Sequence, residues 1–452
     1  MLIALALLLC ALAAAPAAEQ GVHPADIVAE VDRLAAQPLW PGFEPRQTPV
    51  AIYDGERTWL FRHPSPPEGF VLDPEHEGAW IYPGQHAEVR SNTSTNLGGV
   101  STATFIMNPA AKRSLTESAG IVIHETFHVF QRRYHPDWTA NEGELFVYPV
   151  EDAEALHLRR LETEALRRAL LAPNEQEAAG WAKLALEVRG DRFALLPEGS
   201  VGYERGTELN EGLANYVEGQ ATGESVKNLL SAEEFPAEAV RQRIYPVGRA
   251  LGVLLDRFDP EWAKKLDGGQ AKFIDELLNA ALARVDVPSQ DFSDAEVSAS
   301  LRRAYADTAA LQKKKTNLRQ EFLSQPGWKV VLVVEGGEPL WPQGFDPLNV
   351  ERLGGTEVLH TRFLKLGNSS CSLEVLNRRA LTEAAGAHPL FNGVRRLTVT
   401  GLPAEPTVNV PGEGHKVVVK AEGFQAEVQN TVVDQSGKTV TITLGKAAKA
   451  KQ

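Results

Sequence analysis

Cysteine is scarce in this chain, which limits how the fold can be held together. Only Cys10 and Cys371 occur among 452 residues. Cys10 falls in an apolar N-terminal stretch, MLIALALLLCALAAAPAAEQG, whose small residues up to Ala18 are typical of a cleavable signal peptide, residues 1–18. Its removal would leave Cys371 without an intrachain partner. We therefore expect an exported protein, in a bacterial periplasm or outside the cell, that folds without disulfides.

Long apolar runs and an excess of basic residues are also missing. After the N-terminal stretch no segment approaches the roughly 18 continuous apolar residues of a membrane span, so we expect none in the mature chain. The formal net charge is −13, and an acidic chain lacks the positive field that recruits phosphates. We therefore predict no nucleic-acid partner. The short basic end, residues 446–452, is expected to be a solvated tail.

The apolar pattern divides the chain into three regions. Residues 19–110 carry many prolines and glycines between short alternating runs, and they predict a small sheet. Residues 111–325 change to helical periodicity, whereas residues 328–445 return to alternating runs such as WKVVLVVE and KTVTITL. We predict an α+β protein, in which a mainly helical domain with a small N-terminal sheet (19–325) precedes an all-β, sandwich-like domain.

One predicted helix carries most of the chemical information. It lies in ESAGIVIHETFHVFQRRYHP, residues 117–136. Ser114 followed by Glu117 is a capping-box pattern, and apolar residues continue the helix until Pro136 ends it.

Three polar residues on this helix form the pattern of HExxH zinc hydrolases. His124 and His128 lie one turn apart on the same face, so both imidazoles can reach one ion at about 2.0–2.1 Å. Glu125, beside the first histidine, is placed to take a proton from a metal-bound water. The simpler alternative is a buried amphipathic helix with no ion.

A zinc site here needs a third ligand, and the sequence offers three candidates. His135 is one position away from the metzincin spacing and sits at the expected helix end. An aspartate such as Asp137 or Asp152 has no accompanying pattern. Glu211, in TELNEGLANYVEG, projects from a second predicted helix, and the glycine after it allows two helices to approach closely.

This second segment resembles the gluzincins, in particular the M1 aminopeptidases and their relatives, in which an NEGxAxYxE helix follows HExxH. The matching residues are Asn210, Glu211, Gly212, Ala214, Tyr216 and Glu218. The resemblance implies that zinc is bound by His124, His128 and Glu211. The segment between His128 and Glu211 is far longer than in the M1 enzymes, which places the chain outside that family proper.

The resemblance extends to IYPVGRALGVLLDRFDPEW, residues 244–262, which is similar to the segment that follows the third ligand in M1-like gluzincins. A tyrosine there stabilises the oxyanion, which implies the same catalytic role for Tyr245. The alternative is a tyrosine packed at a helix start. Asn215 or Glu218 would orient the ligands, although surface solvation is the simpler role for Glu218. VSTATFIMNPA predicts either an edge strand that pairs with substrate or an ordinary core strand.

These residues predict a secreted zinc-dependent peptidase that hydrolyses a peptide or protein substrate with a metal-activated water and Glu125 as general base. One alternative is a zincin-like envelope protein that acts as a non-catalytic binding module through its C-terminal β domain. Another is a structural metal site, which would need a fourth protein ligand.

Overall fold

A computed structural model describes residues 22–231, 235–345, 349–386, 388–410 and 416–445. The predicted signal peptide and the basic tail lie outside these residues. Contacts divide the chain into two compact units. Unit 1 comprises Met1–Thr139, Leu209–Val226 and Asp259–Lys272, and unit 2 comprises Ala140–Glu208, Lys227–Phe258 and Phe273–Gln452. The chain therefore leaves unit 1 after the HExxH segment and re-enters it just before Glu211.

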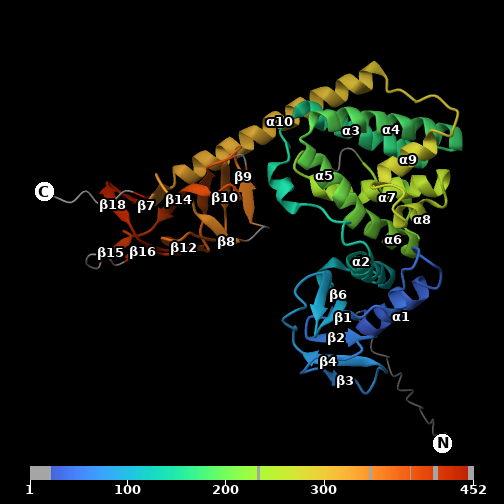
Figure 1. The fold of residues 1–452 in the computed structure, drawn as a ribbon, viewed down its shortest axis with the longest axis horizontal. Helices are drawn as coiled ribbons and strands as arrows, with labels where there is room; N and C mark the ends of the chain where they lie inside the picture. Colours follow the sequence, from blue (N-terminus) through green and yellow to red (C-terminus); the bar gives the residue numbers. More distant parts are fainter. Residues whose placement is uncertain (1–21, 232–234, 346–348, 387, 411–415, 446–452) are drawn as a thin grey trace, which may run out of the picture. The chain divides into compact units, whose positions relative to one another are not determined.

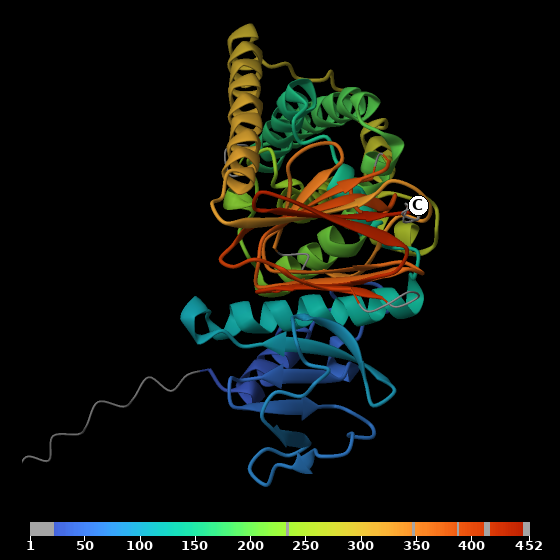
Figure 2. The same ribbon diagram turned by 90° about the vertical axis from the view of Figure 1, so that its left-hand side faces the viewer.

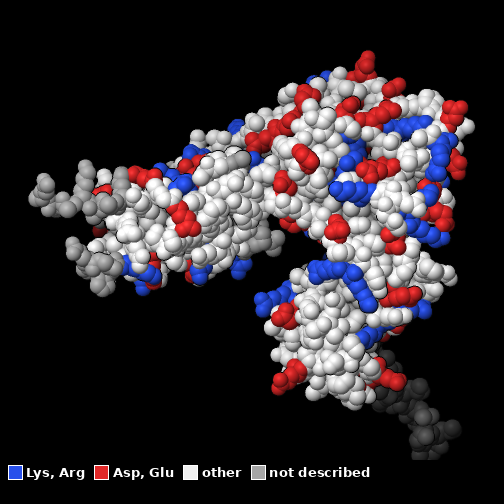
Figure 3. Space-filling view, in the orientation of Figure 1, with Lys and Arg blue, Asp and Glu red and all other residues white. Residues whose placement is uncertain are grey.

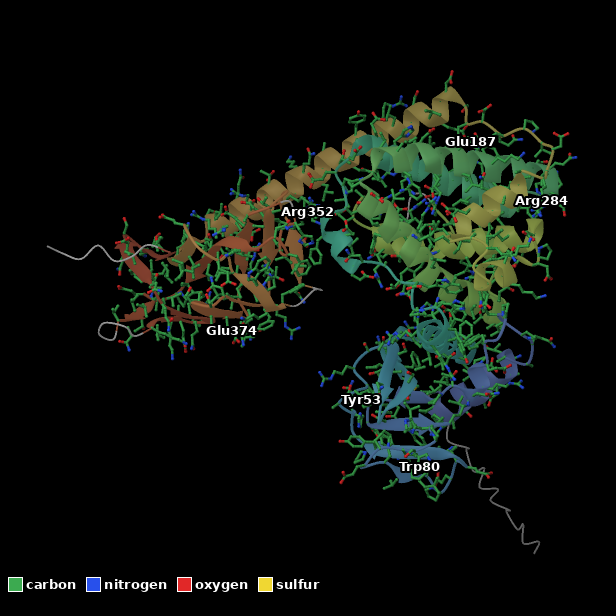
Figure 4. The ribbon with its side chains drawn as sticks, in the orientation of Figure 1. Tyr53, Trp80, Glu187, Arg284, Arg352 and Glu374 are labelled. Atoms are coloured by element: carbon green, nitrogen blue, oxygen red, sulfur yellow. The ribbon has the colours of Figure 1, made fainter. Side chains whose placement is uncertain are left out.

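Unit 1 contains a sheet with the strand order β3-β4-β2-β1-β6-β5 (Figure 1). Only β1 and β6 are parallel in this sheet. Tyr53 of β1 and Trp80 of β4, labelled in Figure 4, pack against one of its buried apolar clusters. The strands are β1 (Val50–Tyr53), β2 (Arg57–Phe61), β3 (Val71–Leu72), β4 (Ala79–Pro83), β5 (Thr93–Leu97) and β6 (Val100–Ile106).

Helices of unit 1 include the predicted HExxH helix and one helix that the sequence reading missed. The capping box of Ser114 and Glu117 is confirmed at the start of α2 (Leu115–Tyr134), which ends just before Pro136. The missed helix is α1 (Pro24–Leu34), which has proline in its first turn and buries Ile27 and Val31. The others are α6 (Leu213–Thr222) and α8 (Trp262–Asp267), with short turns η1 (Pro45–Gln47) and η2 (Pro109–Ala111).

The helical part of unit 2 begins with η3 (Glu142–Val147), after which α3 and α4 form a hairpin through a short link. Their sequences lack the prolines that divide the N-terminal region, so long helices form. Apart from η5 (Val226–Asn228), the remaining helices are α3 (Ala153–Leu171), α4 (Glu175–Leu195), α5 (Glu198–Thr207), α7 (Val240–Phe258), α9 (Ile274–Leu282) and α10 (Asp294–Leu323).

These helices bury a network of ion pairs. Arg192 is fully buried and lies 2.6 Å from Glu162, which also contacts Arg189 at 2.9 Å and Arg243 at 2.8 Å. Figure 3 shows acidic and basic side chains interspersed over the helical region on the face in view. Buried carboxylates in this region are therefore paired with arginines, and both signs of charge occur on the face in view.

The C-terminal region consists of two sheets, visible as stacked layers in Figure 2. One has the order β18-β19-β7-β14-β13-β10-β9 and the other β15-β16-β17-β12-β11-β8. A single apolar cluster takes residues from both sheets, as in a sandwich. In β12, Cys371, Leu373 and Val375 are buried while Glu374, labelled in Figure 4, is exposed.

The strands of the first of these sheets are β7 (Trp328–Val334), β9 (Val350–Arg352), β10 (Glu357–His360), β13 (Ala380–Ala384), β14 (Val394–Leu402), β18 (Thr431–Ser436) and β19 (Thr439–Leu444). Those of the second are β8 (Trp341–Phe345), β11 (Phe363–Gly367), β12 (Cys371–Leu376), β15 (Thr407–Asn409), β16 (Val417–Ala421) and β17 (Phe424–Val428).

Polar contacts join this sandwich to the helical part of unit 2. Arg352, labelled in Figure 4, donates to the carbonyl of Tyr148 at 3.3 Å, and Arg319 of α10 pairs with Glu357 at 2.8 Å. The small N-terminal sheet, the helical middle and the all-β C-terminal region confirm the predicted α+β class. Among the described residues, no helix combines the length and the apolarity that a bilayer crossing requires.

Candidate metal centre

The two histidines of the HExxH pattern lie on the buried side of α2. His124 is 8% exposed and His128 is 9% exposed, and their rings meet edge to face with centroids 4.8 Å apart. The neighbouring Ile123 and Phe127 are fully buried. Since apolar neighbours hold the helix in place, the two imidazoles are fixed on one face, one turn apart, as predicted.

Glu211 comes from a distorted helical turn. The chain runs from α5 through η4 (Glu208–Gly212), a π-helical turn, into α6. Such turns are rare and often occur at functional sites. The close approach of α6 to α2 depends on Gly120, because a Cβ atom there would lie 2.6 Å from the Cγ2 atom of Thr222.

These three side chains converge. The Oε2 atom of Glu211 lies 3.5 Å from Nε2 of His124 and 3.3 Å from Nε2 of His128. All three potential ligand atoms lie within 4.8 Å of one another. Within the described part of the chain, this is the group of His, Cys, Asp and Glu side chains whose spacing could hold a metal ion.

The separations fit a shared ion better than direct hydrogen bonds. Ligands about 2.1 Å from a tetrahedral zinc ion lie roughly 3.4 Å from one another. A charge-assisted hydrogen bond between an imidazolium and a carboxylate would instead be about 2.7–2.9 Å long. Two imidazole nitrogens and one carboxylate oxygen are also a ligand set that catalytic zinc sites use. The residues present therefore fit zinc.

The other ring nitrogen of each histidine has its own partner. Nδ1 of His124 lies 3.1 Å from Oε2 of Glu218, and Nδ1 of His128 lies 2.8 Å from Oε1 of Gln131. Such contacts orient metal-binding imidazoles and leave Nε2 for the ion. The expectation that Glu218 is solvated at the surface was wrong, because Glu218 faces α2 across the helix pair. Asn215, the other candidate, lies 3.4 Å from Glu218.

Gln131 was missed by the sequence reading. It lies three positions after His128 on the same helical face, and that spacing was the available signal. The signal was weak because only the position of the second helix shows where the amide points.

Burial and mutual contacts shift the ionisation of the cluster. Burial lowers the pKa of His124, but the interactions with Glu211 and Glu218 outweigh it and raise that pKa to about 10. Burial alone would raise the pKa of Glu211, whereas the two histidines hold it well below its usual value. Without an ion, the cluster therefore binds a proton, which supplies the positive charge that a metal ion would otherwise bring.

Glu125 follows His124 on α2 and is 7% exposed. Burial raises its pKa, and this effect exceeds the opposing effect of the nearby histidines. Its carboxylate is not part of the converging group of three. A buried carboxyl of raised pKa beside the ligands suits a group that exchanges protons rather than one that binds metal.

The remaining candidates have other contacts. The ring of His135 stacks on Trp138, with centroids 3.8 Å apart, and its Nε2 atom lies 2.8 Å from Oδ1 of Asp267. Asp152 accepts from the amide of Ala155 and caps α3. Neither is among the three converging ligands.

Tyr245 belongs to unit 2, where it lies within α7. Its hydroxyl accepts a hydrogen bond from Arg241 at 3.2 Å, and the guanidinium of Arg241 lies 5.7 Å from the centroid of its ring. Its role at an oxyanion stays a prediction.

The strand in VSTATFIMNPA is not an edge strand. It forms β6, which lies between β1 and β5, so its ladder is used on both sides. The prediction of an edge strand is therefore wrong, and the alternative prediction of a core strand is confirmed. The neighbouring edge strand is β5, where Arg132 of α2 donates to the carbonyl of Ser94.

Comparison of the whole chain with protein-family models, curated proteins and solved structures found no match. The functional argument therefore rests on the residues of the centre and on the sequence motifs.

Proposed function

We propose that this chain is a zinc-dependent hydrolase of peptide bonds, with His124, His128 and Glu211 as the metal ligands. The observation that carries the proposal is the convergence of two Nε2 atoms on one carboxylate oxygen at 3.3 and 3.5 Å. Glu218 and Gln131 hold the opposite ring nitrogens, which supports metal binding over a chance cluster.

Zinc held by these ligands would supply a Lewis acid and lower the pKa of a water in its open fourth position. Glu125 then accepts the proton of the attacking water and returns it to the leaving amine. The raised pKa of Glu125 suits the first step, because a carboxylate of higher pKa is a stronger base.

Peptide or protein as the substrate, export, and oxyanion stabilisation by Tyr245 are parts of the proposal that rest on sequence. The resemblance to gluzincins supports the substrate class and the tyrosine. The N-terminal apolar stretch supports export.

Metal analysis and a broad peptide-library assay, applied to the native protein and to Glu125→Gln, test the proposal. We expect one zinc per chain in both proteins and cleavage only by the native one. Glu117→Gln is the matched control, since Glu117 lies on the exposed first turn of the same helix. It should retain cleavage.

Two results would reject the enzyme. A native protein that binds no zinc would show that the three side chains do not form a metal centre. Zinc in both proteins with no cleavage by either would favour a binding module that keeps the metallopeptidase scaffold.

A further inference from the structure

Gln131 connects the two elements that supply the metal ligands. It is 2% exposed, and its Oε1 atom lies 2.8 Å from Nδ1 of His128. Its Nε2 atom donates to the carbonyls of Leu209 and Asn210, each at 2.9 Å. One amide thus contacts a ligand on α2 and the turn that presents Glu211.

The contacts determine how the amide is oriented and which nitrogen of His128 carries the proton. Only an NH2 group can donate to two carbonyls, so Nε2 of Gln131 must face Leu209 and Asn210. Its Oε1 atom therefore faces His128 as an acceptor. Because an acceptor requires a donor, Nδ1 of His128 carries the hydrogen, and the lone pair of the neutral ring is on Nε2, on the side of Glu211.

The same amide acts on the third ligand. Leu209 and Asn210 lie within η4, the π-helical turn that ends one residue after Glu211. A π-helical turn departs from the i→i−4 hydrogen bonding of an α-helix. Two hydrogen bonds from a buried side chain of α2 hold this turn against the helix that bears the histidines.

We infer that Gln131 is a positioning residue, which fixes the tautomer of His128 and the distance from that ring to Glu211 at the same time. This inference rests on the proposed zinc centre. Partners of this kind typically change metal affinity by about 10- to 100-fold when they are removed.

Chelator competition for zinc on the purified full chain, with the folded fraction checked by circular dichroism, measures the effect. Gln131→Met keeps the length of the side chain and removes all three contacts. We expect zinc affinity to fall about 10- to 100-fold. Gln131→Glu keeps an acceptor for His128 but loses both donors to η4, and should weaken binding by about tenfold.

Thr104→Val is the matched control. Thr104 is also fully buried in unit 1, and its hydroxyl oxygen lies within hydrogen-bonding distance of two backbone carbonyls, at 2.7 and 2.9 Å, but within the sheet. It should lower stability while leaving zinc affinity unchanged. The absorption spectrum of the Co²⁺-loaded protein is a second readout, because its bands report ligand geometry. We expect changed bands in both Gln131 variants and native bands in Thr104→Val.

The outcomes separate this inference from the proposed function. If the native protein binds zinc and Gln131→Met binds it equally well with native Co²⁺ bands, Gln131 has no positioning role although the zinc centre stands. Native affinity in Gln131→Glu would overturn the link to η4. If the native protein binds no zinc, the proposed function fails and the inference fails with it.

Discussion

Each unit buries a cluster of ionisable side chains, and the carboxylates in the two clusters face different partners, arginine in unit 2 and histidine in unit 1. In unit 2, Arg192 and Arg243 lie 2.6 and 2.8 Å from the fully buried Glu162. In unit 1, Glu211 faces His124 and His128 at 3.5 and 3.3 Å. A guanidinium is always charged and donates directly, whereas an imidazole can give up its proton and offer a lone pair to a metal ion.

The difference separates a structural cluster from a candidate metal site. The arginine cluster supplies its own cations within ion-pair distance of the carboxylates. The potential ligand atoms of the histidine cluster lie within 4.8 Å of one another, and the carboxylate oxygen is too far from the ring nitrogens for strong hydrogen bonds. Burial of charged side chains alone therefore does not mark a candidate metal site. The distances between the side chains, and histidine rather than arginine as the partner of the carboxylate, do.

The largest expected effect comes from breaking the arginine cluster. Glu162→Gln removes a carboxylate that three buried arginines share, while Glu204, Glu208 and Asp275 still pair with them. It should lower the free energy of unfolding by about 3 kcal/mol. Chemical denaturation measures this change, and zinc affinity of the folded protein should stay native. Glu261→Gln, which removes an exposed partner of Lys264, should leave stability unchanged. A native unfolding curve for Glu162→Gln would show that the cluster contributes nothing to stability.

Removal of the third proposed ligand, Glu211, should affect zinc affinity. Glu211→Gln keeps the shape of the side chain but removes the charge, and we expect zinc affinity to fall more than about 100-fold, beyond the usual effect of an outer partner. Chelator competition gives the value, with the exposed Glu88→Gln as a control that should bind normally. Unchanged affinity in Glu211→Gln would remove Glu211 from the ligand set.

His360 extends the comparison to a buried group with no charged partner. It lies in the sandwich, its Nε2 is 3.2 Å from Oγ1 of Thr382, and burial lowers its pKa to about 4. Because the unfolded chain, with the ordinary value of 6.5, binds a proton first, stability is complete above pH 6.5 and is lost as pH falls toward 4. The loss between pH 7 and pH 5 should be about 2 kcal/mol.

Unfolding of the native protein and of His360→Gln at both pH values isolates this contribution. The variant should lose less stability than the native protein over the same interval. Parallel losses in the two proteins would show that His360 does not titrate in this way.

The smallest effect is expected from Glu218. Glu218→Gln keeps an acceptor for Nδ1 of His124 but removes its charge, so zinc affinity should fall by about tenfold. Thr222→Val, which removes only a hydroxyl contact with the backbone of Glu218, should bind zinc like the native protein. A tenfold loss in both variants would point to packing of α6 rather than to the carboxylate.

Features with a local signal were predictable from the sequence. The capping box of Ser114 and the helical spacing of His124 and His128 depend on residues within a few positions of one another. The motif around Glu211 predicted its proximity to the two histidines, and the fold class followed from the change between periods of 3.6 and 2.

Features that depend on tertiary neighbours were not predictable. Whether Glu218 meets water or His124 depends on how α6 packs on α2, and the contact of Gln131 with η4 depends on the same packing. The internal position of β6 depends on strand pairing distant in sequence. The helix α1 was overlooked because the prolines and glycines around it dominated the local pattern.

Anomalous X-ray scattering at the zinc edge, from crystals of the native protein grown with zinc, tests the central claim most directly. We predict one strong peak about 2.0–2.2 Å from Nε2 of His124, Nε2 of His128 and a carboxylate oxygen of Glu211. Zinc bound elsewhere, with these three side chains in direct contact with one another, would contradict the account.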